Sequence, residues 1–241
     1  MKILALDSSG LVASVALVQD GILIGEYTIN YKKTHSQTLL PMLEEVRKMV
    51  DLDMQDVDAI AISAGPGSFT GLRIGSATAK GLGLALNKPL VAVPTLEGLA
   101  YNLYGTDKLV CPLMDARRNQ VYTGVYEFVA DKEHGMVMKT GVEQCAVDIR
   151  EIIGKLNDLQ RDVIFLGDGV PVYEQILKQE MKVPFVFAPA HRNRQSAASV
   201  AALAEVYYKE GKIESAAEHQ PDYLRLSQAE RERMEQEQAN A

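Results

Sequence analysis

Two aspartates, Asp7 and Asp115, are the first candidates for chemistry, because each directly follows a short apolar run that is typical of a buried strand. A carboxylate at the end of a strand can position a magnesium ion or a phosphate group, although the same side chain also caps turns. Ser8, Ser9 and Ser68 have no histidine and aspartate in the pattern that activates a serine nucleophile, so the sequence does not support a serine hydrolase.

A glycine-rich turn supplies the second candidate. An apolar run ends at Ile62, the chain turns through Gly65-Pro66-Gly67, and a helical pattern begins near Thr70. Backbone N–H groups at such a junction point outward at the positive end of the helix dipole and can bind an anion. The Gly-Lys-Ser/Thr ending that makes a P-loop specific is missing, so a structural turn is the default interpretation of Gly65 and Gly67.

The helix predicted for residues 70–86 carries a stripe of small residues at Gly71, Gly75, Ala79 and Gly83, which share one face because they recur every four positions. Each glycine inside a helix costs roughly 0.5–1 kcal/mol relative to alanine. A closely packed neighbour must offset that cost. The neighbour is either the protein's own sheet or the surface of another molecule, and the residues alone leave both alternatives open.

The composition is that of an ordinary globular protein. Of the 241 residues, 47% are hydrophobic and 24% are charged. No apolar run approaches the length of a membrane-spanning helix, so we expect a cytoplasmic protein that does not contact membranes. The net charge of −7 has the wrong sign for a broad nucleic-acid surface. Any RNA is therefore expected to be held mostly by a partner and contacted by this chain only indirectly.

No metal site and no disulfide are expected. The sequence contains four histidines without a pair at metal-ligand spacing: His35, His134, His191 and His219. Cys111 and Cys145 lie in apolar surroundings and are also without such spacing, so two reduced thiols are expected. Arg117 and Arg118, close to Asp115, are interpreted as a solvated turn.

Hydrophobic periodicity arranges these candidates on a repeated series of elements. In the first half we expect strands over residues 2–8, 12–19, 22–30, 58–63 and 90–93, and helices over 37–50, 70–86 and 95–103. In the second half we expect strands over 109–115, 120–128, 137–144 and 163–166, and helices over 148–159, 170–179 and 196–209. Asp20-Gly21 predicts a tight hairpin. Both halves predict a strand–strand–strand–helix–strand–helix unit, which suggests an internal duplication.

Duplicated halves of this kind resemble the superfamily of actin, hexokinase and the Hsp70 ATPase domain. The resemblance implies an α/β, ribonuclease-H-like fold with two mixed-sheet subdomains flanked by helices. In that superfamily the turns after the first strands grip phosphate from opposite sides of a cleft, and a Gly-Asp-Gly loop holds the adenosine. The candidate nucleotide-binding residues, with the turn glycines included, are then Asp7, Ser8, Ser9, Gly65, Gly67, Asp115, Gly167 and Gly169.

Six motifs in order resemble the TsaB family, also called YeaZ: LALDSSG at the start, HSQTLLP at 35–41, AISAGPGSFTGLRIG at 61–75, PTLEGLA at 94–100, MDARRNQVY at 114–122 and PDYLR at 221–225. The resemblance covers nearly the whole chain, up to about residue 227. It implies a non-catalytic subunit in the synthesis of threonylcarbamoyladenosine in tRNA. Such a subunit binds a TsaD-like catalytic paralogue and works with a TsaE-like ATPase.

TsaD carries its catalytic metal on a helix with the pattern N-H-x-E-G-H. Residues 94–99 of this chain read P-T-L-E-G-L, so Thr95 and Leu99 stand where the resemblance places the two histidines. They still share a helix face, but leucine has no lone pair and threonine is a poor replacement for imidazole. The resemblance therefore implies a fold that has lost its catalytic metal. The alternative is an autonomous ATP-dependent kinase or a peptidase.

In the TsaB family the helices over 37–50 and 70–86 form the dimer face. The resemblance therefore assigns partner binding, or homodimer formation when the chain is alone, to Leu39, Met42, Leu43, Val46, Met49, Gly71, Leu72, Gly75, Ala79, Leu82 and Gly83. Core packing only is the alternative for these residues. No cofactor is expected in the chain itself, and a nucleotide, ATP or ADP, is expected at most at the interface with the catalytic partner.

We divide the chain into an N-terminal subdomain over residues 1–105, which carries the dimerisation helices, and a C-terminal subdomain over residues 106–228. The helix over 196–209 is expected to pack back on the first subdomain. The segment over 229–241 is charged and has few apolar residues, so it is expected to form a flexible tail.

Overall fold

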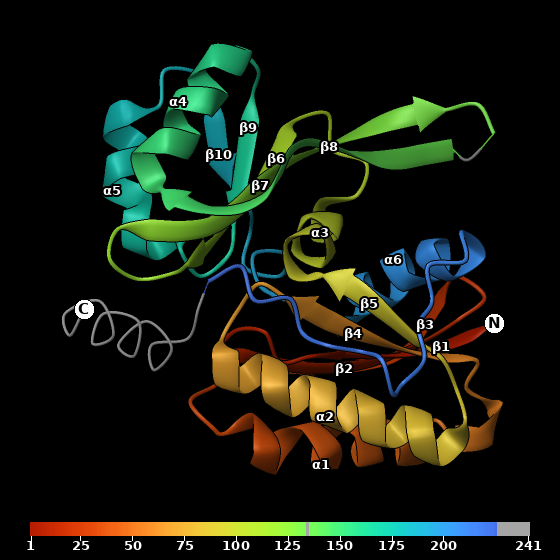
Figure 1. The fold of residues 1–241 in the computed structure, drawn as a ribbon. Helices are drawn as coiled ribbons and strands as arrows, with labels where there is room; N and C mark the ends of the chain where they lie inside the picture. Colours follow the sequence, from red (N-terminus) through yellow and green to blue (C-terminus); the bar gives the residue numbers. More distant parts are fainter. Residues whose placement is uncertain (134, 226–241) are drawn as a thin grey trace, which may run out of the picture.

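The computed structural model describes residues 1–133 and 135–225, which form two five-stranded sheets (Figure 1). The predicted tail over residues 229–241 lies outside the described residues. The first sheet has the order β3-β2-β1-β4-β5, with bounds Ile22–Asn30, Val12–Gln19, Lys2–Asp7, Ala59–Gly65 and Leu90–Pro94. The second has the order β10-β9-β6-β7-β8, with bounds Phe185–Phe187, Val163–Leu166, Leu109–Asp115, Gln120–Asp131 and Gly135–Asp148.

The two sheets have the same pattern of strand directions. β1 pairs antiparallel with β2 and parallel with β4, and β6 pairs antiparallel with β7 and parallel with β9. The outermost strands continue these directions, since β3 and β8 are antiparallel to their neighbours while β5 and β10 are parallel to theirs. This agreement confirms the predicted fold class, a duplicated α/β fold with two mixed sheets.

Two pairs of helices cover the outer faces of the sheets. α1 (His35–Met49) and α2 (Phe69–Leu86) lie side by side on the first sheet, and α4 (Ile149–Leu159) and α5 (Val170–Glu180) lie on the second (Figure 1). The apolar side of α1 is buried against β1, β2 and β4. α4 and α5 are buried against β6, β7 and β9. Each half thus has its own apolar core between a sheet and two helices.

The third pair of helices joins the two halves. α6 (Ala197–Lys209) belongs to the second half in sequence but packs its small apolar residues on β1, β2, β4 and β5 of the first sheet. α3 (Thr95–Ala100) follows the first sheet and packs Leu96, Leu99 and Ala100 on β6 and β7 of the second. Because each half contributes a helix to the other, the strand ends of the two sheets are held facing each other. No helix within the described residues is long and apolar enough to cross a membrane.

Candidate functional site

The turn after β1 holds the first candidate carboxylate inside the protein. Asp7 is only 2% exposed. Its Oδ1 accepts hydrogen bonds from the backbone N–H of Ser9 at 2.9 Å and from the Ser9 hydroxyl at 2.7 Å. Burial raises the pKa of the Asp7 carboxyl, and the bonds from Ser9 oppose that rise. Asp7 therefore stabilises its own turn and does not face a ligand.

The glycine turn and the first turn of α2 close over the same residues. Ser68 N donates to Ser9 O at 2.7 Å, and Ser8 Oγ donates to Gly71 O at 2.9 Å. A Cβ atom at Gly71 would lie 2.0 Å from the Ser8 carbonyl oxygen, and a Cβ atom at Gly75 would lie 2.4 Å from Ser8 Oγ. The stripe of small residues therefore lets α2 approach the chain's own β1 turn. The hydrogen bond from Ser68 N to Ser9 O also means that this N–H group, one of those predicted to bind an anion, already has a partner within the chain.

The turn after β6 has a different shape. Arg117, Arg118 and Asn119 have φ angles of 66°, 56° and 61°, and the left-handed conformation costs roughly 1–2 kcal/mol for each such residue. Arg117 N donates to Asp115 Oδ1 at 2.9 Å, and Arg117 Nη1 lies 3.3 Å from Asp115 Oδ2. The Tyr173 hydroxyl of α5 donates to Asp115 Oδ1 at 3.3 Å. Asp115 is thus held between α5 and a strained, exposed turn.

The Gly-Asp-Gly loop lies directly behind this turn. Cβ atoms at Gly167 and Gly169 would lie 2.1 Å and 3.0 Å from the Leu113 carbonyl oxygen of β6. Between the glycines, Asp168 Oδ1 accepts a hydrogen bond from Asp115 N at 3.3 Å, and burial raises the pKa of the Asp168 carboxyl. The two glycines therefore permit close packing on β6, and Asp168 is the residue of the loop that reaches the cavity described next.

A cavity of about 680 Å³ lies between the two turns and is called here the inter-half cavity. From the predicted nucleotide-binding set it is lined by Ser9, Gly67 and Asp115. The remaining members of that set do not line it: Asp7, Ser8, Gly65, Gly167 and Gly169. The structure adds lining residues to which the sequence analysis assigned no role: Lys32, Phe69, Asp168 and Arg225. Three of them lie in segments that the sequence analysis singled out: Phe69 in the motif over 61–75, Asp168 in the Gly-Asp-Gly loop and Arg225 at the end of PDYLR.

The segment after α6 links the two halves beside the inter-half cavity. Asp222 N donates to Ala64 O at 2.7 Å, which attaches the segment to the end of β4. Gln144 Nε2 donates to Asp222 Oδ2 at 2.7 Å, and Arg225 Nη1 donates to Ala116 O at 2.5 Å, which attaches it to β8 and to the β6 turn. The relative position of the two turns is therefore fixed by hydrogen bonds from this segment.

The positions where the resemblance places the two histidines of TsaD are used for packing. Thr95 is fully buried, and its Oγ1 accepts hydrogen bonds from Gly65 N at 3.0 Å and from Ser63 Oγ at 3.2 Å. Leu99 is part of the core between α3 and the second sheet. Within residues 1–133 and 135–225, no group of three or more His, Cys, Asp or Glu side chains is placed to hold a metal ion.

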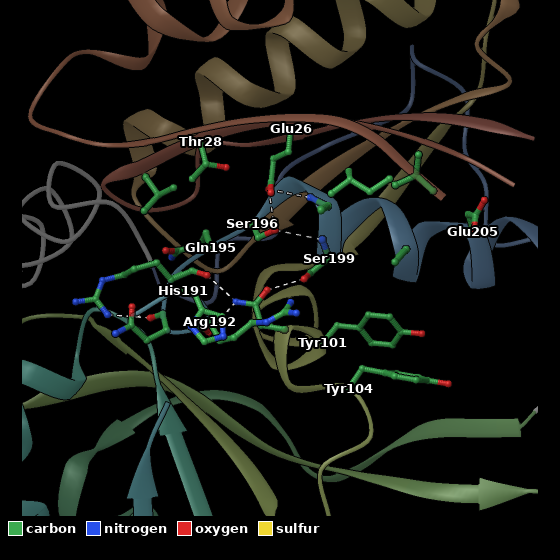
Figure 2. Close-up of a pocket in the computed structure, with 18 of the residues that line it drawn as sticks. Glu26, Thr28, Tyr101, Tyr104, His191, Arg192, Gln195, Ser196, Ser199 and Glu205 are labelled. Atoms are coloured by element: carbon green, nitrogen blue, oxygen red, sulfur yellow. Dashed lines mark hydrogen bonds between the residues drawn. The ribbon is translucent and has the colours of Figure 1, made fainter. Parts of the chain in front are cut away.

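A larger hollow of about 1020 Å³ lies on the other face of the first sheet, between β3, α6 and residues 190–196 (Figure 2). Its polar side chains bind one another. Glu26 Oε1 accepts from the Ser196 hydroxyl at 2.7 Å and from Ala198 N at 3.2 Å, and Ser199 Oγ donates to Asn102 Oδ1 at 2.6 Å. The Glu26 carboxylate thus caps the N-terminus of α6, and we interpret the hollow as a structural junction.

Comparisons with known proteins decide the family. A family model described as TsaD, tRNA N6-adenosine threonylcarbamoyltransferase, matches residues 23–233. The tRNA threonylcarbamoyladenosine biosynthesis protein TsaB of Bacillus subtilis (strain 168) is 34% identical to this chain, over 95% of this chain and 96% of its own length. The chain belongs to the TsaB family.

Other members of the TsaB family agree with this result in sequence and in structure. The protein of the same name from Escherichia coli (strain K12) is 30% identical over 93% of this chain and 95% of its own length. The crystal structure of YeaZ from Pseudomonas aeruginosa is similar with a TM-score of 0.74 and 28% identity, covering 92% of this chain and 99% of that one. The resemblance indicated by the six motifs is thereby confirmed.

The predicted docking residues lie on α1 and α2 but differ in how exposed they are. Most of the predicted ones are buried inside the chain: Leu39, Met42, Leu43, Val46, Gly71, Leu72, Gly75, Ala79 and Gly83. Leu82 is partly buried, whereas Met49 is 81% exposed. The small stripe packs on the chain's own β1 turn and β4, and near Ala216, so core packing accounts for it. Other residues of α1 and α2 are exposed: Leu40, Ala77, Gly81, Leu84 and Ala85.

Proposed function

We propose that this chain serves the formation of threonylcarbamoyladenosine in tRNA as a non-catalytic subunit that docks onto a TsaD-type catalytic partner. The partner transfers the threonylcarbamoyl group to the adenosine 3′ of the anticodon, and a TsaE-type ATPase completes the complex. Membership of the TsaB family supports the pathway. The observation that carries the docking role is the outward face of α1 and α2.

This outward face includes exposed apolar and small residues. Leu84 of α2 is 62% exposed and Met49 of α1 is 81% exposed. Ala77, Gly81 and Ala85 recur every four residues on the solvent side of α2, and nothing lies within 4 Å of a Cβ atom built at Gly81. Side chains this small let a second helix approach closely, and exposed Met adapts its shape to a partner. These observations support docking through the outer stripe of α2.

The geometry of the other candidate residues supports a non-catalytic role. Thr95 and Leu99 are buried, so they offer no ligand to a metal. The Asp7 carboxylate is turned inward and bonded to Ser9, whereas an autonomous kinase needs that carboxylate in its cleft. Any ATP or ADP of the pathway is therefore proposed to bind with the partner, at the shared interface and not within this chain.

We further propose that the isolated chain pairs with a second copy through the same outward face. An interface around a two-fold axis uses the same residues on both subunits, so the paralogous partner and the second copy compete for one surface. Adding the catalytic partner should then replace homodimers by heterodimers as its concentration rises.

A charge placed on the outward face tests the proposal. Gly81→Arg puts a long cation in the middle of the small stripe, at a helix position where a side chain meets no neighbour. Gly154→Arg makes the same change at an exposed glycine of α4, which also has open space around it. We expect Gly81→Arg to abolish co-purification with the TsaD-type partner and tRNA modification, while Gly154→Arg preserves both.

The test depends on an unchanged fold. Gly75 is unsuitable, because a Cβ atom there would lie 2.4 Å from Ser8 Oγ and would disturb the core. Both arginine variants should match the unmodified protein in circular dichroism and in the midpoint of urea unfolding. If Gly81→Arg is folded and still binds the partner as well as Gly154→Arg does, the docking face has been assigned wrongly.

A further inference from the structure

We propose that the mouth of the inter-half cavity contacts RNA directly, by binding the phosphates and a base of an unpaired stretch of the tRNA substrate. The proposal rests on the proposed function, which brings tRNA to the complex. Its basis is a group of cations at one cavity of an acidic protein, called here the basic rim. Lys32, Arg117 and Arg225 line the cavity. Arg73 contacts the lining residue Phe69, and Arg118 follows Arg117 in the chain.

The basic rim is assembled from four separate parts of the chain. Lys32 lies between β3 and α1, Arg73 is in the first turns of α2, Arg117 is in the β6 turn, and Arg225 is in the segment after α6. Lys32, Arg117 and Arg225 line the same cavity. Arg73 joins them through Phe69, another lining residue, because its guanidinium lies 4.4 Å from the centroid of the Phe69 ring. The fold therefore concentrates cations that are scattered in sequence.

Most of this charge is not neutralised within the molecule. In the described part of the chain, only Arg117 of the basic rim forms an ion pair, with Asp115. Lys32, Arg73 and Arg118 have no carboxylate partner there, and Arg225 bonds to a backbone carbonyl. The net charge of −7 is an average over the whole surface. It excludes a broad nucleic-acid surface, but it does not exclude a local one.

The β6 turn presents two of these cations in a strained conformation. The left-handed run Arg117–Arg118–Asn119 is held by Gln120 N donating to Arg117 O at 3.1 Å and by Ile149 N donating to Asn119 O at 3.2 Å. Such conformations persist where the surrounding structure imposes them, and they concentrate at functional sites. A solvated turn has no need of three consecutive residues in this region, so the strain points to a use for the arginines.

An aromatic stack supplies a surface for a base. The Phe69 and Tyr223 rings are 4.2 Å apart between centroids and nearly parallel, at 20°. The Arg73 guanidinium covers the Phe69 ring as well, whereas Tyr223 is 38% exposed. Unpaired bases stack on such rings whatever their sequence, and flanking cations hold the backbone. Cations and aromatic rings side by side are the combination that a single-stranded nucleic acid requires.

The geometry favours RNA at the mouth over a free nucleotide inside the cavity. Asp115 and Asp168 both line the cavity, and their carboxylates disfavour a deeply inserted triphosphate. The turn after β1 is closed here, since Ser68 N bonds to Ser9 O. The basic rim comes from four separate segments of the chain. A polyanion that passes across the mouth meets these cations in turn.

Charge reversal at two exposed members of the rim tests the proposal. Lys32→Glu/Arg118→Glu removes two cations that make no ion pair in the described structure. Lys139→Glu/Lys182→Glu is the matched control, because it changes net charge equally at two exposed lysines outside the basic rim. The binding of unmodified tRNA to the complex of each full-length variant with the TsaD-type partner is measured over a series of salt concentrations.

The rim variant should bind tRNA at least about tenfold more weakly at low salt. The slope of log K against log salt should become less steep by about 1.5 units, because each of the two lost phosphate contacts contributes roughly 0.7–0.9. Tyr223→Ala should weaken binding by roughly five- to a hundredfold with little change in slope, because stacking does not release counterions. Equal effects of the rim and control variants would overturn the proposal. A second result would also overturn it. If ATP competes with tRNA for the unmodified chain but not for the rim variant, the basic rim binds a nucleotide and not RNA.

The partner readout separates this proposal from the proposed function. All the rim and control variants should co-purify with the TsaD-type partner as the unmodified chain does, because none of the substituted residues lies on α1 or α2. Failure of the unmodified chain to bind the partner would contradict the docking role alone. In that case the binding of labelled tRNA to the isolated full-length chain still tests the basic rim. If Lys32→Glu/Arg118→Glu binds the tRNA as well as the unmodified chain does, the RNA contact is rejected.

Discussion

The two halves of the molecule share one topology but treat the turn after their first strand in opposite ways. In the first half, α2 meets the turn with Gly71 and Gly75, and the helix closes over Ser8. In the second half, α5 meets the equivalent turn with Tyr173, whose hydroxyl reaches Asp115. The glycines bring the backbone of α2 against the first turn, whereas α5 reaches the second turn with the Tyr173 hydroxyl. The first turn is therefore buried and the second remains at the surface.

This difference shows how a duplicated fold divides its roles. The closed turn withdraws the Asp7 carboxylate from the cavity and turns it into a structural group. The open turn keeps Asp115, Arg117 and Arg118 at the cavity and at the surface. The residues with which the following helix meets the turn thus differ between the closed turn and the open one. The predictions below test that statement, from the largest expected effect to the smallest.

Filling the glycine contact should have the largest effect. In Gly71→Leu, the new Cβ atom is placed 2.0 Å from the Ser8 carbonyl oxygen, and the helix must move away, which also breaks the bond from Ser8 Oγ to Gly71 O. Overpacking costs about 1–3 kcal/mol, and a buried hydroxyl without its partner costs a similar amount. We expect the free energy of unfolding, measured in urea, to fall by roughly 3–5 kcal/mol.

Gly81→Leu is the control for this change. It adds the same side chain to the same helix at an exposed position where a Cβ atom meets nothing within 4 Å, so its unfolding free energy should be unchanged or slightly higher, because leucine is a better helix former than glycine. A loss as large as that of Gly71→Leu would mean that α2 does not tolerate leucine for reasons unrelated to the turn.

The buried carboxylate of the closed turn should be visible as a pH dependence. The pKa of Asp7 is raised in the folded state, so the folded protein holds a proton that the unfolded chain releases. The stability that Asp7 provides is fully present below the ordinary pKa of about 3.9 and is lost as the pH rises through the folded pKa, at about 1.4 kcal/mol for each pKa unit. Asp7→Asn has no such loss.

The measurement compares urea unfolding of the two proteins from acid pH to neutral pH. The stability of the unmodified protein relative to Asp7→Asn should be greatest at the acid end and should decline toward neutrality. Other titrating groups are common to both proteins and cancel in the difference. A relative stability that instead increases with pH would show that the carboxylate is better stabilised as an anion than its burial indicates.

Much of this fold could be predicted from local sequence signals. The alternation of apolar residues and the Asp20-Gly21 turn, whose φ angles are 52° and 77°, give the first hairpin directly. The strand β10 was missed because Phe185–Phe187 is only three residues long and carries no alternating pattern. A short outermost strand of this kind is defined by its pairing with β9, which no local window contains.

The site was harder to predict than the fold. A stripe of small residues has the same sequence whether it meets its own sheet or another protein, so the direction of Gly71 and Gly75 could not be read from the pattern. Lys32 and Arg225 lie nearly two hundred residues apart along the chain and meet at one cavity only because α3 and α6 join the halves. The roles of single residues therefore required the tertiary structure.

The open turn depends on one hydroxyl, and removing it should have a moderate effect. Tyr173 donates to Asp115 Oδ1 and to Gln120 O, each at 3.3 Å. Tyr173→Phe should therefore lower the free energy of unfolding by about 0.5–1.5 kcal/mol. The amides of Gln120 and Ile149, which donate within this turn or to it, should exchange with solvent faster, as measured by hydrogen exchange.

Tyr126→Phe is a matched control in the same half. The buried Tyr126 hydroxyl has no hydrogen-bond partner among the described residues, so its removal should leave stability unchanged or slightly increased. If both substitutions have the same effect on stability and on exchange, the Tyr173 hydroxyl does not hold the turn open.

The smallest effect should come from replacing an exposed helix glycine in each half, Gly81 in the first and Gly154 in the second. The comparison tests whether the first half, but not the second, contacts a second copy of the chain. Gly81→Ala and Gly154→Ala should each stabilise the protein by about 0.5–1 kcal/mol, because alanine has the lower conformational entropy in the unfolded chain and both sites have open space. For Gly154, on the second half, the gain in melting temperature should not depend on protein concentration.

For Gly81 the gain should shrink as concentration rises, because pairing through the outward face then brings a second copy against the added methyl group. Equal gains at every concentration would place homodimer formation elsewhere on the molecule.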